Sequence, residues 1–244
     1  AIIQMANGLK RLKENNIDSF FILGEHDISR IRTTPVPYVY HNLGFSKYIG
    51  NGKPIEYKGI MLAGLDKIRK TEMTQYEETF SNLDKSVEKF SGHKILVLHQ
   101  GITEFNKFAG ELQSTDLPKN FTYYAMGHLH DKDIKQFNHL KGPIAYPGSI
   151  ELTTSEGIKD VKKGFFEVDI SGKEAIPKWI ELDTRPQFSF NTKYTELEKT
   201  IGEIIEKISD LTKKPMIQVK IEGEDIEIDH IQAQIARLNS LALR

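Results

Sequence analysis

Cysteine is absent from the 244-residue sequence, which excludes disulfide frameworks and thiolate zinc sites. Long hydrophobic runs are absent as well. The apolar stretches reach four or five residues, whereas a transmembrane helix needs about 20. The apolar residues near the N-terminus recur with helical spacing, which is not the pattern of a secretory signal. These absences predict a cytoplasmic protein that makes no membrane contact.

An excess of one charge is also missing. The 33 lysines and arginines nearly balance the 34 aspartates and glutamates, so the net charge is −1. Nucleic-acid binders often carry a basic patch, and the overall charge does not indicate one here. Any nucleic-acid contact must therefore come from local clusters, and a solvated loop explains such clusters equally well. The candidates are Arg30, Arg32, Lys67, Arg69 and Lys70.

The first 183 residues read as a layered α/β domain, because short apolar strands that are buried on both faces need covering layers. Helical periodicity predicts helices over 1–14 and about 71–90. Residues 28–53 read as loop-rich, with strand fragments at “PYVY” and “SKYIG”. The other expected strands lie at 19–23, 59–65, 94–98, 122–126, 133–138, 143–146, 164–170 and 178–182.

The pattern of the sequence changes near “DTRPQFSFN” at 183–191, and a small second domain is expected over 184–244. Six apolar residues at helical spacing over 197–211 predict one helix, and alternation over 217–222 predicts a half-buried strand. Asp229 and Gln232 resemble a capping box that opens a last helix. The expected domains are therefore 1–183 and 184–244.

Three of the apolar runs end in the same kind of motif. “FFIL” is followed by “GEHD” at 24–27, “ILVL” by “HQG” at 99–101, and “YYAM” by “GHLH” at 127–130. Sites in layered α/β proteins gather at the carboxyl ends of strands. His128 and His130 are two residues apart, so in an extended chain they would point to the same side, with Leu129 toward the core.

Four of the eight histidines occur in these motifs, together with two carboxylates. Without thiolates, imidazole and oxygen ligands suit manganese, iron or zinc. Two such ions can clamp the attacking and leaving oxygens of a phosphoester and activate water. The visible set of His99, His128, His130 and one carboxylate is too small for two ions, so the centre looks incomplete.

The ordered motifs resemble the calcineurin-like metallophosphoesterase superfamily, whose five motifs run D-x-H, G-D-x-x-D, G-N-H-D/E, a lone H and G-H-x-H. The last three appear here in order. Within the superfamily the chain is most similar to the SbcD and meiotic-recombination-eleven type of double-strand-break repair nuclease. “LHQG”, “GHLH”, “YPGSIE” and “KGFFEV” carry that resemblance, together with a small α/β unit like that family's capping domain.

The resemblance implies a metallophosphoesterase β-sandwich flanked by helices, and a role for each motif residue. His99 and His128 would bind one ion, Glu25 stands where the family has that ion's asparagine ligand, and His130 would bind the other ion. His26 would be the catalytic histidine that stabilises charge on the phosphate or protonates the leaving oxygen. Asp27 would either orient His26 and its loop or hold a simple turn or helix cap. The usual cofactor of the family is Mn²⁺.

Two departures from the family pattern matter. D-x-H and G-D-x-x-D are absent from the 244 residues, so we expect a nuclease domain truncated at its N-terminus, with weak metal occupancy and little activity. Glu25 replaces asparagine, and its longer, charged side chain either binds the ion more tightly or swings out and leaves a water.

The expected activity is a DNA nuclease, exonuclease or endonuclease, for double-strand-break repair, in which Arg30 and Arg32 contact DNA phosphates. Its implied partners are DNA, an SMC-like ATPase of the SbcC type and a second copy of the chain. The implied location is the nucleoid or the nucleus. The alternatives are a small-substrate phosphodiesterase of the same superfamily and a non-catalytic DNA-binding or scaffold lobe.

Overall fold

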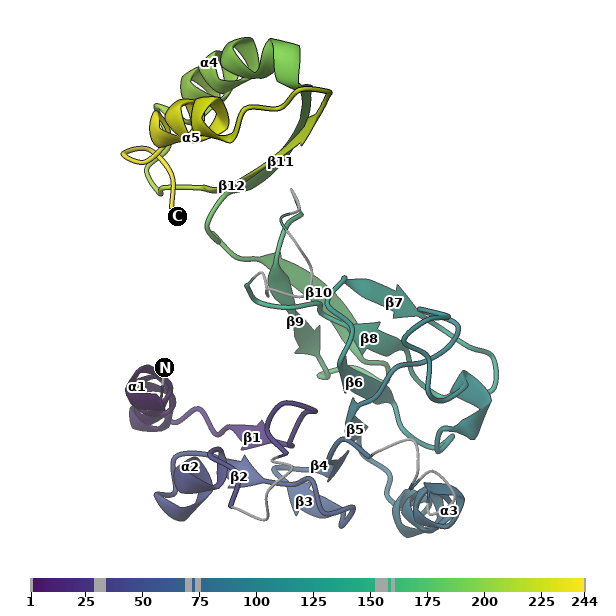
Figure 1. The fold of residues 1–244 in the computed structure, drawn as a ribbon. Coiled ribbons are helices and arrows are strands. Elements are labelled where there is room, and N and C mark those ends of the chain that lie inside the picture. The colour runs from purple at the N-terminus through teal and green to yellow at the C-terminus, as the bar shows by residue number, and fades with distance from the viewer. Residues whose placement is uncertain are drawn as a thin grey trace. The chain divides into compact units, whose positions relative to one another are not determined.

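The computed structural model describes residues 2–28, 34–68, 72, 76–151, 158 and 161–243. The chain is mixed α/β and divides into two compact units (Figure 1). The first unit contains 1–148 and 166–179, and the second contains 149–165 and 180–244. The assignment of 1–183 and 184–244 as a nuclease domain and a capping domain stays a prediction.

A six-stranded mixed sheet forms the centre of the first unit, in the order β3-β4-β5-β6-β8-β7. Its four inner strands, β4, β5, β6 and β8, are parallel, and the edge strands β3 and β7 run antiparallel to their neighbours. Parallel strands end at the same edge, so the ends of β4, β5 and β6 lie together. The strands are β3 (Ile55–Tyr57), β4 (Ile60–Leu65), β5 (Lys94–His99), β6 (Tyr123–Gly127), β7 (Asp133–Lys135) and β8 (Ile144–Tyr146).

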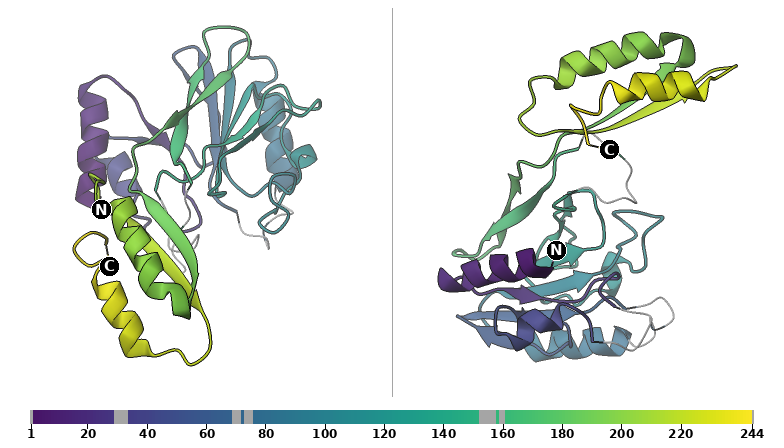
Figure 2. Two further views of the ribbon diagram at one scale, coloured as in Figure 1. Left: turned by 90° about the horizontal axis from the view of Figure 1, so that it is seen from above. Right: turned by 60° about the vertical axis from the view of Figure 1, so that its left-hand side comes forward.

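Both faces of this sheet are covered, as the apolar runs predicted. Strand residues alternate between two apolar clusters, because successive side chains point to opposite faces. Leu96 and Tyr124 join the cluster that contains the buried residues of helix α3 (Tyr76–Val87). The one-turn helix η2 (Ser114–Asp116) lies between β5 and β6 in the chain. Tyr123 and Ala145 join the cluster formed with the hairpin of β9 (Gly164–Asp169) and β10 (Ile176–Glu181). Figure 2 shows the helix and the hairpin on opposite sides of the sheet.

The N-terminal part of the first unit contains helix α1 (Ile2–Glu14) as predicted, but the strand expected at 19–23 is only two residues long. That strand, β1 (Phe20–Phe21), pairs in parallel with β2 (Lys47–Tyr48). The interpretation of “PYVY” as a strand fragment is wrong, because it begins helix α2 (Tyr38–Asn42). Pro37 already has helical angles, φ −59° and ψ −22°, and proline is well tolerated at a helix start.

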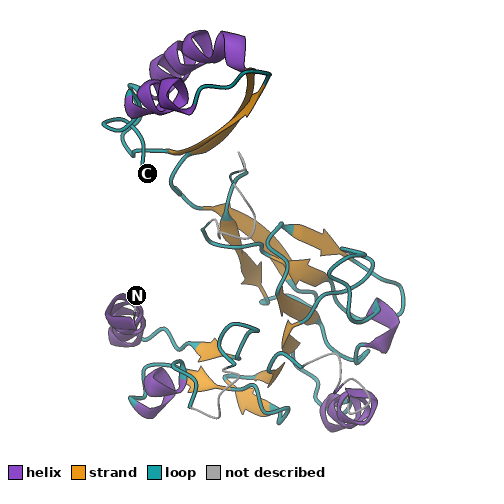
Figure 3. Cartoon of the chain, viewed as in Figure 1, coloured by secondary structure: helices purple, strands orange, loops and turns teal. Residues whose placement is uncertain are grey.

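The second unit packs helices α4 (Leu197–Ile208) and α5 (Ile228–Ala236) on one side of a two-stranded parallel ribbon, β11 (Gln187–Lys193) and β12 (Met216–Glu222) (Figure 3). The one-turn helix η3 (Tyr194–Glu196) precedes α4. Strand β11 was not predicted, because it begins within the segment 183–191 that was interpreted as the boundary between the two domains. The capping box is wrong as well: the helix begins one residue before Asp229, and its N-cap, Glu227, makes no side-chain cap bond.

No helix in the described part of the chain is long and apolar enough to cross a membrane.

Two glycines give a matched test of the backbone. A Cβ on Gly202, within α4, meets no atom within 4 Å, so Gly202→Ala is expected to raise the free energy of unfolding by about 0.5–1 kcal/mol through helix propensity. Gly59 also has open space but lies at φ +79° in the β3–β4 turn, so Gly59→Ala is expected to cost about 1 kcal/mol. Urea unfolding of both variants measures the difference, and equal effects would contradict the assignment of these conformations.

Candidate functional site

Two of the predicted histidines meet at the carboxyl edge of the sheet. His99 is the last residue of β5 and lies opposite Gly127, the last residue of β6, and His128 follows directly. The two imidazole rings are 5.4 Å apart between centroids, with their planes at 65°. The sequence therefore placed His99 and His128 together correctly at the ends of neighbouring parallel strands.

The glycines of two motifs make room for the His99 ring. A Cβ on Gly24 would lie 2.9 Å from Cε1 of His99, and a Cβ on Gly127 would lie 2.8 Å from its Nδ1. Real Cβ contacts are longer than this, so any side chain at either position would displace the ring. Gly24 and Gly127 are thus required by the close approach of the His99 ring.

The “GEHD” segment forms a tight turn that Asp27 closes. The backbone N–H of Gly24 donates to Oδ2 of Asp27 at 2.8 Å, and the N–H of Asp27 donates to the carbonyl of Gly24 at 3.1 Å. Of the two roles left open for Asp27, these bonds support the turn. The turn leaves the side chains of Glu25 and His26 exposed at its tip.

Asp66 fastens this turn to the end of β4. Its Oδ1 accepts a bond from the N–H of Leu23 at 2.8 Å, and its Oδ2 accepts one from the hydroxyl of Tyr48 at 2.6 Å. The N–H of Lys67 donates to the carbonyl of Leu23 at 2.8 Å. Burial raises the pKa of Asp66, and the nearby charge of Asp27 raises it further. The “GEHD” turn is therefore held beside the strand ends that carry His99 and His128.

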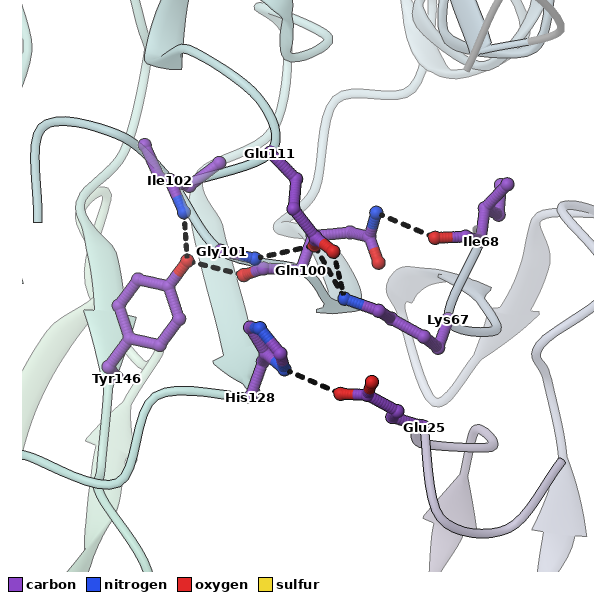
Figure 4. Close-up of polar contacts among 9 residues, drawn as sticks. All are labelled: Glu25, Lys67, Ile68, Gln100, Gly101, Ile102, Glu111, His128 and Tyr146. Carbon is purple, nitrogen blue, oxygen red and sulfur yellow. Dashed lines mark hydrogen bonds and ion pairs between the residues drawn. The ribbon is translucent and has the colours of Figure 1, made fainter. Parts of the chain in front are cut away.

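Glu25 reaches His128 from this turn. Its Oε2 lies 3.5 Å from Nδ1 of His128, and its side chain is 53% exposed (Figure 4). The expectation that “GHLH” is extended is wrong at its first histidine, because β6 ends at Gly127 and His128 has φ +91°. A non-glycine residue rarely adopts this conformation, and such backbone strain clusters at functional sites. Leu129 packs against the core as expected.

The two histidines are held in their neutral form. Burial, together with the neighbouring His128, Lys67 and His26, lowers the pKa of His99 to about 4, against an opposing effect of Glu111. Burial and Lys67 also lower the pKa of His128, while Glu111 and Glu25 oppose that shift. Neutral imidazoles keep a lone pair free at neutral pH, which is the form that binds metal ions.

A buried ion pair behind the histidines was not predicted. Nζ of Lys67 lies 2.6 Å from Oε1 of Glu111, and the two side chains are only 6% and 19% exposed. Glu111 also accepts the N–H of Gly101 at 3.2 Å (Figure 4). Lys67 had been considered as a surface contact for nucleic acid, and its burial in this pair contradicts that idea.

Tyr146 of β8 fixes the backbone that follows His99. Its hydroxyl donates to the carbonyl of Gln100 at 2.6 Å and accepts the N–H of Ile102 at 3.1 Å. The stretch “YPGSIE” contains Tyr146 but did not indicate this role, and no motif contained Glu111, because each acts through a contact with a residue that is far away in sequence.

The residues present fit a metal site in their chemistry but not in their number. Neutral imidazoles and a carboxylate suit a divalent transition ion. Within the described ranges, however, no group of three or more histidine, aspartate or glutamate side chains lies close enough to hold an ion. His130 is half-buried and close enough to lower the pKa of His128. The predicted phosphate contacts Arg30 and Arg32, like Arg69 and Lys70, lie outside the described residues.

The depressed pKa of His99 predicts a pH-dependent stability. In metal-free buffer the unfolded chain binds more protons than the folded chain between pH 6.5 and pH 4, so stability falls as the pH falls through this window. At about 1.4 kcal/mol per pH unit, the loss reaches about 3 kcal/mol near pH 4. Urea unfolding across this range is expected to show a steeper fall for wild type than for His99→Gln. Parallel profiles would contradict the assignment, and His139→Gln, an exposed control, should follow wild type.

Comparison with known proteins identifies relatives. No protein-family model matches the chain. It is 31% identical over 224 residues to the DNA double-strand break repair protein Mre11 of Methanocaldococcus jannaschii, across 88% of this chain and 59% of that protein. The Mre11 proteins of Thermoplasma acidophilum and Saccharolobus solfataricus are each 29% identical, over 98% and 100% of this chain and 66% and 65% of their own lengths.

The chain thus spans about three fifths to two thirds of the length of these curated relatives, and the matches extend over most or all of the chain. The match to the Saccharolobus solfataricus protein covers the whole chain and therefore includes the three strand-end motifs. The resemblance drawn from those motifs is confirmed: the chain is a relative of the archaeal Mre11 proteins and is of the Mre11 and SbcD type.

Proposed function

We propose that the chain is the nuclease part of a metal-dependent DNA nuclease for double-strand-break repair, which hydrolyses phosphodiester bonds as an exonuclease or endonuclease. The observation that carries the proposal is the meeting of His99 and His128 at one sheet edge, with Glu25 3.5 Å from His128. The name of the relatives, DNA double-strand break repair protein Mre11, supplies the substrate class.

The finer architecture belongs to the same proposal. The two-faced sheet with its helix and hairpin layers would be a metallophosphoesterase β-sandwich, covering 1–183. The ribbon and two helices of the second unit would be its capping domain, covering 184–244. A proteolysis experiment that releases a stable fragment from about residue 184 onward would support this boundary.

His99 and His128 would hold one ion together with Glu25, and His130 would help to hold a second, with Mn²⁺ as the proposed metal. The chemistry supplied by bound ions at such sites is activation of water and stabilisation of the charged oxygens. His26 needs no place among the ligands. Its exposed side chain lies at the tip of the turn, close enough to affect the pKa of His99, where it can donate a proton or hydrogen bond to a phosphate or leaving oxygen.

The proposed partners are DNA, an SMC-like ATPase of the SbcC type and a second copy of the chain, at the nucleoid or in the nucleus. Apolar side chains exposed on α1 and α2 favour the second copy, because surface helices of soluble monomers rarely expose so many. These side chains are Ile2, Ile3, Met5, Leu12, Val39 and, just after α2, Leu43. Sedimentation of wild type and an Ile3→Asp variant tests this contact.

Cleavage and metal binding test the proposed activity. The 244-residue chain and the product of its whole gene are compared by Mn²⁺ calorimetry and by cleavage of labelled duplex DNA with and without EDTA. We expect weak binding and little cleavage by the chain alone, because D-x-H and G-D-x-x-D are absent from it. Metal-dependent DNA cleavage by the whole product supports the proposal, and its absence would sink it.

One observation favours a second candidate, a DNA-binding or scaffold lobe without catalysis. The described residues gather no complete metal site. Filter binding of DNA without metal, combined with no cleavage by the whole gene product, would support this candidate. Faster cleavage of a small aryl phosphodiester than of DNA would instead indicate a small-substrate phosphodiesterase.

Glu25→Asn probes the proposed ligand directly. A carboxylate oxygen binds a divalent cation more strongly than a neutral carbonyl, so we expect Mn²⁺ affinity of the whole gene product to fall about 10-fold. Calorimetry measures the change, and Glu56→Asn, on the exposed face of β3, serves as the control. Unchanged affinity in Glu25→Asn would remove Glu25 from the proposed ligand set.

A further inference from the structure

Phe108 exposes its whole side chain, at 103% of the reference area, which is more than any other large hydrophobic residue in the described part of the chain. It lies in the loop 101–112, which follows His99 along the chain. Most exposed apolar side chains of a soluble protein need no explanation. Phe108 differs because the loop that presents it is tightly braced and adjoins the candidate site.

The loop is braced by bonds on both sides of Phe108. Oδ1 of Asn106 accepts the backbone N–H of Phe108 at 2.9 Å and that of Ala109 at 3.2 Å. The N–H of Thr103 donates to the carbonyl of Leu112 at 2.8 Å, which closes the base of the loop. The backbone that carries the ring is therefore fixed before any ligand arrives, so binding pays less to order it.

The same loop abuts the histidines. A Cβ on Gly101 would collide with the carbonyl of Ala109 and would lie 3.3 Å from Cδ2 of His128. The residue after Phe108 is thus packed against the backbone that runs beside the His128 ring. Glu111, three residues after Phe108, binds both Gly101 and Lys67. The loop is part of the wall of the candidate site, and Phe108 marks its exposed tip.

The surroundings of Phe108 favour a nucleobase over an apolar protein surface. Its sequence neighbours are Asn106, Lys107 and Ala109, and its full exposure means that the ring packs against no apolar neighbour. An exposed aromatic ring that follows a lysine in the sequence matches the pattern of single-strand binding, in which a base stacks on the ring and its phosphate meets a positive charge. Protein docking surfaces need a larger continuous apolar area.

We infer that Phe108 is a base-stacking residue that holds an unpaired nucleotide at the end of a DNA strand beside the candidate site. The inference rests on the proposed function and deepens it, because it assigns the loop 101–112 to the recognition of frayed or single-stranded ends. Paired DNA offers no free base face, so Phe108 contributes nothing to the binding of a closed duplex.

Binding by the 244-residue chain in EDTA tests this inference without requiring catalysis. Wild type, Phe108→Ala and Phe108→Trp are titrated with two DNAs, a duplex with a single-stranded overhang and a dumbbell duplex whose ends are both closed. Phe108→Ala is expected to weaken binding of the overhang DNA about 10-fold and to leave dumbbell binding unchanged, since stacking acts on an unpaired base. Phe108→Trp is expected to keep wild-type affinity, with tryptophan fluorescence quenched by the overhang DNA and not by the dumbbell.

Ile228→Ala is the matched control, because Ile228 is an exposed apolar residue of the second unit. This variant should bind both DNAs like wild type. Equal affinities of wild type and Phe108→Ala for the overhang DNA would overturn the inference, and so would an equal loss on both DNAs. If wild type binds neither DNA, the inference fails, and cleavage of DNA by the whole gene product still decides the proposed function. If it binds both and Phe108→Ala changes nothing, only the inference fails.

Discussion

Lys67→Met is expected to destabilise the chain by about 3 kcal/mol, because it leaves the Glu111 carboxylate largely buried without its partner cation. Nζ of Lys67 lies 2.6 Å from Oε1 of Glu111, and the lysine side chain is only 6% exposed. Methionine fills a similar volume, so lost packing contributes little. Urea unfolding at pH 7 measures the change in the free energy of unfolding.

Two further variants separate the buried charge from other effects. Lys162 and Glu181 form an exposed pair at 2.9 Å, so Lys162→Met should cost far less stability than Lys67→Met. The double variant Lys67→Met with Glu111→Leu should recover part of the lost stability, because it removes the unpaired charge. If Lys67→Met costs no more than Lys162→Met, the pair does not hold the wall of the site together.

The elements that the sequence predicted correctly are those whose burial is periodic over many residues. Helices α1, α3 and α4 each repeat apolar residues at helical spacing, and β4, β5 and β6 are short apolar runs buried on two faces. Helix α2 and strand β11 were not predicted. Helix α2 is short, and β11 begins within the segment 183–191 where the sequence pattern changes, so the periodicity of apolar residues is weak and tertiary contacts determine the secondary structure. Tyr40 of α2, for example, is buried at 6% exposure in a helix of five residues.

The candidate site was likewise predicted only in part from the sequence. The motifs placed His99 and His128 together, because they lie at the ends of the neighbouring strands β5 and β6. Glu25 follows β1 of a separate two-stranded sheet, and bonds from Asp66 and Lys67 hold its turn beside those ends. They could not indicate the Lys67–Glu111 pair, whose partners lie 44 residues apart in sequence. The positive φ of His128 could not be predicted from the motif either, because the sequence of “GHLH” is compatible with a strand that continues past Gly127. The backbone leaves the sheet there, and His128 adopts a conformation that no propensity favours.

His26→Gln is expected to lower DNA cleavage by the whole gene product about 10²- to 10⁴-fold, the usual contribution of a general acid or base. His26 is exposed at the tip of the Gly24–Asp27 turn, and the bonds that close that turn do not involve its side chain. Glutamine keeps a hydrogen-bond donor but cannot deliver a proton at neutral pH. The turn, the His99 ring and the Glu25–His128 contact should therefore stay in place.

Three measurements on the same variant separate the roles open to His26. Cleavage under single-turnover conditions reports the chemical step, Mn²⁺ calorimetry reports the ligands, and filter binding reports DNA affinity. A catalytic histidine predicts a loss in the first measurement alone, whereas a metal ligand would lose affinity for Mn²⁺ in parallel with the rate. His139→Gln, on the exposed surface of the first unit, should leave all three at wild-type values. An unchanged cleavage rate in His26→Gln would remove His26 from the chemistry, and the “GEHD” turn would then serve the site through Glu25 and the space that Gly24 leaves for His99.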